Sequence, residues 1–199
     1  MQKELTVTSN NQTVKGTWGQ ATNPFDGVVP LVIFATIEDD VKKTEIYTNF
    51  LNNSGILTFA FKAKDIDEAK KFFHASFEEL RGEDAVASEY IVFAGFGDAG
   101  RAAALTASEI GNSVRGLFLM APTFVPEDIL KVEKYNGEVA ILAGTEDDDV
   151  NLDNLETVAS RMPHAEVLQV RGGKHVYGER EVDRAQMLLR TFVMTALNK

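Results

Sequence analysis

Residues 90–108 read YIVFAGFGDAGRAAALTAS, and this stretch decides the fold. It begins with an apolar run typical of a buried strand and continues as an alanine-rich run typical of a helix. Between the two runs, residues 95–100 read GFGDAG, and three glycines in six residues indicate a sharp turn. The stretch therefore predicts a strand, a tight turn and a helix in immediate succession.

The same alternation of strand and helix extends along the chain on both sides of this stretch. Strands are predicted over 28–36, 56–63, 90–95, 114–121, 138–144 and 166–172, and helices over 41–55, 65–82, 99–111, 152–162 and 179–198. Two further strands, 3–9 and 13–19, flank Asn10-Asn11 and predict an opening hairpin, while 126–137 reads as a short helix or an irregular connection. The pattern predicts one α/β domain over residues 1–199, with a mostly parallel sheet of about eight strands flanked by helices.

Composition excludes several classes of function. The formal net charge of −10 argues against nucleic acid or an anionic membrane as a partner. The chain has no cysteine, which excludes disulfides, thiolate metal sites and cysteine nucleophiles. No apolar run is long enough for a membrane helix, and the polar start shows no signal peptide. A cytoplasmic location is the default expectation, although a mature secreted chain would look the same.

The predicted topology gathers the chemically interesting residues at one edge of the sheet. Right-handed crossovers bring every strand-to-helix loop to the carboxyl edge, where such sheets bind ligands. The loops expected there contain residues 36–40, 97–100, 144–149 and 172–175. The candidate binding residues at this edge are Thr36, Ile37, Phe96 and Asp98.

Four segments in order resemble landmarks of the α/β-hydrolase superfamily. They are GFGDAG at 95–100, VRGLFLMAP at 114–122, VAILAGTEDDDV at 139–150 and EVLQVRGGKHVYGERE at 166–181. The resemblance covers nearly the whole chain and implies an α/β-hydrolase fold without a lid, because only residues 123–137 separate the sixth strand from the strand that leads to the acid. It places Gly97 at the nucleophile position, Asp147 at the acid and His175 at the general base.

The resemblance also implies a catalytic gap. Glycine has no side chain with which to attack a substrate, and an acidic residue, Asp98, follows it where the family places an oxyanion-stabilising N–H. The loop at 35–40 reads ATIEDD, and the loop at 62–65 is cut to KAKD. These departures imply an esterase-like protein with a degenerate triad that has lost serine-hydrolase activity. Such a pseudoenzyme would use no cofactor and would bind a small molecule or a protein partner, a second copy included.

Several alternatives stay open. Asp98 could be a nucleophile if the turn is shifted by one residue, although an acid favoured by the helix dipole is the simpler interpretation. Asp147 and His175 could form a general-base dyad that acts on a small ester, although a structural pair is favoured. The acidic run 146–149 could join Asp39, Asp40 and Asp98 around a hard cation, although a solvated acidic loop is the better interpretation and no metal site is predicted.

Overall fold

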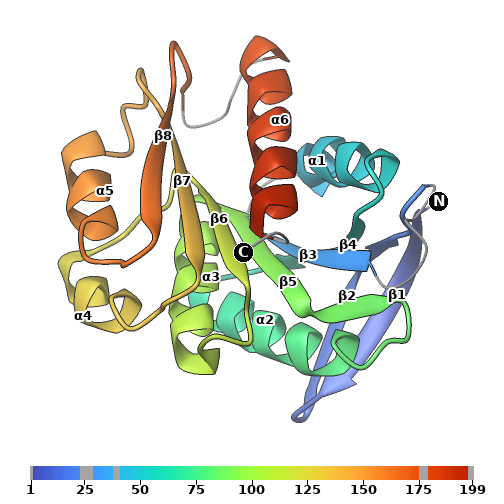
Figure 1. The fold of residues 1–199 in the computed structure, drawn as a ribbon. Helices are drawn as coiled ribbons and strands as arrows, with labels where there is room; N and C mark the ends of the chain where they lie inside the picture. Colours follow the sequence, from blue (N-terminus) through green and yellow to red (C-terminus); the bar gives the residue numbers. More distant parts are fainter. Residues whose placement is uncertain (1, 23–28, 38–40, 175–178, 197–199) are drawn as a thin grey trace.

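The computed structural model describes residues 2–22, 29–37, 41–174 and 179–196 of the 199-residue chain. Within those ranges a single eight-stranded sheet has the order β1-β2-β4-β3-β5-β6-β7-β8 (Figure 1). Its strands are β1 (Gln2–Ser9), β2 (Gln12–Gly19), β3 (Val29–Ile37), β4 (Leu57–Ala63), β5 (Val86–Phe96), β6 (Gly116–Met120), β7 (Glu138–Gly144) and β8 (Ala165–Val170). Strand β2 runs antiparallel to β1 and β4, and β3 to β8 are parallel. The predicted mostly parallel sheet is confirmed.

Helices cover both faces of this sheet. They are α1 (Val41–Asn53), α2 (Ile66–Leu80), α3 (Gly97–Ile110), α4 (Ile129–Val132), α5 (Leu152–Ala159) and α6 (Glu179–Ala196), with a 3₁₀ turn η1 (Pro126–Asp128) before α4. Residues of α2, α3 and α5 share one buried cluster with the sheet, and residues of α1 and α6 share a second cluster on the other face. The connection at 126–137 is therefore a short helical segment followed by a loop.

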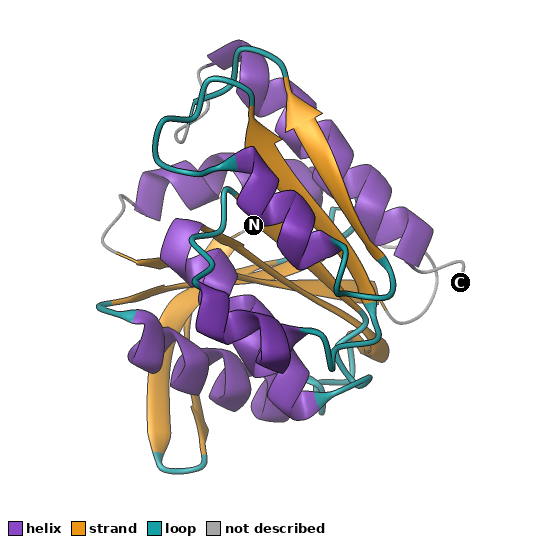
Figure 2. Ribbon diagram, turned by 90° about the vertical axis from the view of Figure 1, so that its left-hand side faces the viewer, coloured by secondary structure: helices purple, strands orange, loops and turns teal. Residues whose placement is uncertain are grey.

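The opening hairpin is confirmed at the predicted place. Asn10 and Asn11 have φ values of 52° and 60°, the left-handed conformation that a two-residue hairpin turn requires. Figure 2 shows this hairpin projecting beyond the helices at one end of the molecule. Its second strand joins the main sheet through antiparallel pairing of Gly16–Gly19 with β4.

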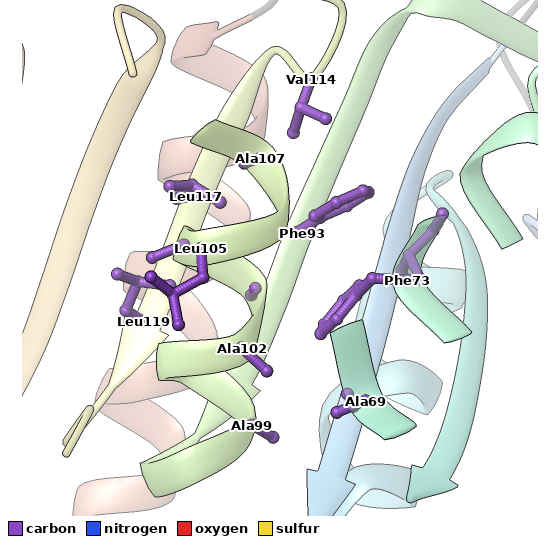
Figure 3. Packing of buried hydrophobic residues seen from close by; sticks show 14 of the residues in the cluster. Ala69, Phe73, Phe93, Ala99, Ala102, Leu105, Ala107, Val114, Leu117 and Leu119 are labelled. Carbon is purple, nitrogen blue, oxygen red and sulfur yellow. The ribbon is translucent and has the colours of Figure 1, made fainter. Parts of the chain in front are cut away.

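The alanine-rich helix α3 lies close against the centre of the sheet. Ala99, Ala102 and Ala103 are completely buried, and their small side chains let the helix approach β5 closely. Figure 3 shows Phe93 of β5 beside Phe73 of α2, and the two rings stack with centroids 4.8 Å apart. The turn between β5 and α3 is thus supported by a well-packed core. None of the described helices is long and apolar enough to cross a membrane.

Candidate functional site at the carboxyl edge of the sheet

The sharp turn predicted from the sequence lies at the junction of β5 and α3. Strand β5 ends at Phe96, and α3 begins at the next residue, Gly97, whose φ of 48° lies in the left-handed region that favours glycine. A Cβ atom on Gly95 would lie 2.7 Å from the Ala99 carbonyl carbon and 2.8 Å from the Gly100 nitrogen. The backbone therefore folds back on itself around Gly97, which is buried and presents no side chain.

Asp98 is held by a partner from the next strand connection. Its carboxylate accepts a hydrogen bond from the Thr123 hydroxyl, which follows β6. Asp98 is exposed in the first turn of α3, where the helix dipole favours a negative charge. This contact ties the loop after β6 to the turn after β5.

A buried ion pair makes a second tie between the same two segments, and the sequence analysis missed it. Arg101 Nε donates to Asp128 Oδ2 at 2.6 Å, and the Arg101 Nη2 donates to Asp128 Oδ1 at 3.3 Å. Asp128 is 1% exposed and also accepts from the Val125 N–H at 3.1 Å. One signal could have drawn attention to the pair, because Arg101 is the lone charge in an alanine-rich segment of helix.

Asp147 stands apart from the other acidic residues of its run. Its carboxylate is half-buried, whereas Glu146, Asp148 and Asp149 are exposed. Asp147 Oδ1 accepts from the backbone N–H groups of Asp149 at 2.9 Å and Val150 at 3.1 Å. The turn after β7 therefore fixes the orientation of one carboxylate and leaves its neighbours in solvent.

The turn after β7 is bonded directly to the turn after β8. The Glu146 N–H donates to the Gly173 carbonyl at 2.9 Å, and the Gly172 N–H donates to the Thr145 hydroxyl at 2.9 Å. A Cβ atom on Gly144 would overlap the Gly173 carbonyl, so only glycine allows the two turns to meet this closely. The structure thus bonds the Asp147 turn to Gly173, which comes two positions before His175 in the sequence. His175 itself lies outside the described residues.

The end of β3 supplies two of the predicted binding residues. Thr36 is buried, and Ile37 is partly buried at the last position of the strand. Glu38, Asp39 and Asp40 lie outside the described residues, so the predicted acidic loop is not placed. Ile37 borders an open hollow of about 490 Å³ whose other walls are the first turns of α2 and α3. Its lining residues are Ile37, Lys64, Asp65, Ile66, Asp67, Asp98 and Arg101.

The acidic residues do not assemble into a cation site within the described ranges. No group of three or more histidine, aspartate or glutamate side chains there is arranged to hold a metal ion. In the hollow, Asp65 instead serves as the N-cap of α2, as predicted, and accepts from the Glu68 N–H at 2.8 Å.

Comparisons with known proteins bear on the fold alone. No family model matches the sequence, and no curated protein matches it. Solved structures match over nearly the full length. Est1E from Butyrivibrio proteoclasticus has a TM-score of 0.85 at 14% identity, with 98% of this chain and 99% of that chain covered. Dienelactone hydrolase from Anabaena variabilis ATCC 29413 has a TM-score of 0.85 at 13% identity, covering 98% and 97%.

A third similar structure is esterase 2 from Thermogutta terrifontis, phosphorylated by paraoxon, with a TM-score of 0.75 at 13% identity, covering 98% of this chain and 94% of that one. Est1E has also been solved with ferulic acid bound. The chain therefore has the α/β-hydrolase fold that the four sequence landmarks implied, and its structural neighbours are esterases and related hydrolases.

Proposed function

We propose that this protein is a hydrolase-like binding module that has lost serine-hydrolase activity and takes a small molecule at the carboxyl edge of the sheet. The observation that carries the proposal is Gly97, the first residue of α3, in the sharp turn where this fold presents its nucleophile. Serine catalysis needs an Oγ at that point, and loss of such a serine lowers kcat by about 10⁶-fold. No other described residue stands at the apex of this turn.

The charge around the turn supports the same conclusion. An oxyanion is stabilised by N–H groups and positive charge placed where negative charge develops. Here the residue after Gly97 is an aspartate, and Thr123 holds its carboxylate at the start of α3. Arg101, one turn further along the helix, is neutralised by Asp128. These contacts favour binding over acyl transfer at this edge.

A second candidate function rests on Asp147. Its half-buried, doubly hydrogen-bonded carboxylate lies in the turn that is bonded to the segment preceding His175. An Asp147–His175 dyad would activate water as a general base on a small ester, without a covalent intermediate. We favour the first function because Gly97 offers no side chain for a covalent route, and Arg101 beside the turn is already paired with Asp128.

Turnover of p-nitrophenyl acetate and butyrate distinguishes the two candidates. We expect the wild-type protein to hydrolyse both esters at the rate of buffer alone, and a fluorophosphonate probe to leave it unlabelled. The His175→Ala variant is the control, and its rate should equal that of the wild type. Hydrolysis well above the buffer rate that is lost in His175→Ala would favour the general-base dyad over the binding module. Labelling by the fluorophosphonate probe would reveal an unrecognised serine nucleophile.

Ligand binding is tested separately from turnover. Because Est1E binds ferulic acid, the first probes are ferulic acid and its neutral ethyl ester, titrated calorimetrically into the wild-type protein. We expect saturable binding of at least one of them. Absence of heat with both at millimolar concentration would count against a small-molecule site of this class and would turn attention to a protein partner.

A further inference from the structure

Two buried hydroxyl groups beside the turn have no hydrogen-bond partner in the part of the chain that the structure describes. They are Thr36 Oγ1, on the last buried residue of β3, and the Tyr47 hydroxyl of α1. Their residues are 1% and 3% exposed. Burying a hydroxyl without a partner costs about 1–3 kcal/mol, so a folded protein rarely keeps such a group unless something else uses it.

Both hydroxyl groups belong to residues that adjoin the same side chain, Phe96. The Tyr47 and Phe96 rings meet edge to face with centroids 5.4 Å apart. The centroid of the Phe34 ring lies 5.9 Å from that of Tyr47 and 5.5 Å from that of Phe96. Ala35 pairs with Gly95, so the next residues along the two parallel strands, Thr36 and Phe96, are cross-strand neighbours on one face. We call Phe34, Thr36, Tyr47 and Phe96 the Phe96 cluster. Because Phe96 immediately precedes Gly97, this cluster adjoins the turn.

Among the members of the Phe96 cluster, Phe96 is the most exposed to solvent. Phe34 and Tyr47 are buried, whereas Phe96 is half-buried. The side chains packed around the Phe96 cluster on this face of the sheet are apolar and include Leu51, Ala60 and Ala94. A ligand that reached the two hydroxyl groups would therefore meet the Phe96 ring and apolar side chains.

Other buried hydroxyl groups show that partners are normally found. The Tyr135 hydroxyl donates to the Val114 carbonyl at 2.9 Å, Thr106 donates to the Ala102 carbonyl at 2.8 Å, and Thr58 donates to Asn52 at 3.0 Å. Ser76 of α2 is a further buried hydroxyl without a partner in the described residues, but it belongs to the opposite face of the sheet from the Phe96 cluster. Thr36 and Tyr47 differ from it because both adjoin Phe96, the residue before Gly97.

We infer that Thr36 and Tyr47 are ligand-binding residues, and that their hydroxyl groups bond the uncharged carbonyl of an ester, lactone or amide whose aromatic or acyl part lies against Phe96. This inference rests on the proposed binding function and names the class of its ligand. A carboxylate is disfavoured because the apolar cluster would strip its hydration without supplying a counter-charge. Burial raises the pKa of Tyr47, which keeps its hydroxyl protonated and able to donate.

The test combines stability with binding in the variants Tyr47→Phe and Thr36→Val, each of which removes one hydroxyl while keeping the shape of the side chain. Because the hydroxyl groups have no partner among the described residues, we expect each variant to melt at the wild-type temperature or about 2 °C above it. Titrated with ethyl ferulate, each variant should bind about 3- to 10-fold more weakly than the wild type. Ferulic acid should bind the wild type more weakly than its ester.

Two matched variants serve as controls. Tyr135→Phe removes a hydroxyl that has a partner, so it should lower the melting temperature and leave ethyl ferulate binding unchanged. Ser76→Ala removes an unpartnered hydroxyl on the other face, so it should not lower the melting temperature and should also leave binding unchanged.

Each contrary outcome is distinct. Equal binding of ethyl ferulate by the wild type, Tyr47→Phe and Thr36→Val would overturn the inference and leave the proposed function standing. A lower melting temperature in Tyr47→Phe would assign that hydroxyl a structural role instead. Tighter binding of ferulic acid than of its ester would overturn the ligand class. Failure of the wild type to bind either probe would remove the proposed small-molecule function and the inference with it.

Discussion

Replacing Arg101 by methionine is expected to lower the free energy of unfolding by about 3–5 kcal/mol, because the change leaves a buried carboxylate without its counter-ion. Asp128 is 1% exposed, and its two oxygens receive both hydrogen bonds of the Arg101 guanidinium. The remaining donor described for that carboxylate, the Val125 N–H, is neutral. Methionine keeps the length and apolar stem of arginine, so the lost charge is the main difference. Urea unfolding followed by circular dichroism measures the change.

Lys70 provides the matched control for Arg101. It pairs with Glu109 at 2.7 Å, but the Glu109 side chain is 58% exposed, and Lys70→Met should cost at most about 1 kcal/mol. Adding Asp128→Asn to Arg101→Met should recover part of the loss, because the uncompensated charge is then gone. If Arg101→Met proves no more destabilising than Lys70→Met, the ion pair does not hold the loop after β6 against α3 as the structure indicates.

Gly144→Ala is the second substitution with a large expected effect, a loss of about 3 kcal/mol in the free energy of unfolding. The added methyl group would overlap the carbonyl of Gly173, which belongs to the backbone and cannot rotate away. The turns after β7 and β8 would have to separate, and the hydrogen bond from the Glu146 N–H to Gly173 would be lost. Urea unfolding gives the stability, and faster hydrogen exchange of the Glu146 amide would locate the damage.

Gly82→Ala is the control for Gly144→Ala. A Cβ atom on Gly82 would lie 3.5 Å from the Glu79 carbonyl oxygen, an ordinary contact, so this variant should change stability by no more than about 1 kcal/mol in either direction. A wild-type-like stability and Glu146 exchange rate in Gly144→Ala would contradict the close approach of the two turns. It would also contradict the bonding of the Asp147 turn to the turn after β8.

The local signals in the sequence were sufficient for the elements and their order. Apolar runs of strand length gave β3, β4, β6 and β7 because strands covered on both faces need apolar residues at every position. Asn10-Asn11 gave the hairpin, and Asp65 gave the start of α2, because both residues act on backbone only a few positions away. The same reasoning placed the turn before α3 at residues 95–100.

The environment of each side chain at the carboxyl edge could not be predicted in this way. Arg101 and Asp128 are 27 residues apart, and in the sequence they look like surface charges. Only the tertiary structure shows that η1 brings Asp128 to Arg101 of α3. Nothing in the run Glu146 to Asp149 shows that Asp147 alone is half-buried. Tyr47 reads as an ordinary helix residue, and only the packing of α1 against β3 and β5 places its ring against Phe96.

The sequence by itself determined an α/β domain with a sharp glycine turn after its fifth strand, because hydrophobic period, glycine and capping residues act over a few neighbouring positions. The tertiary structure decided which side chains lose water and which find partners, because burial and pairing arise from elements distant in the chain. It assigned Arg101 to Asp128, buried Asp147 more than its acidic neighbours, and left the hydroxyl groups of Thr36 and Tyr47 without partners among the described residues. These three results concern the candidate site, where function depends on such long-range contacts.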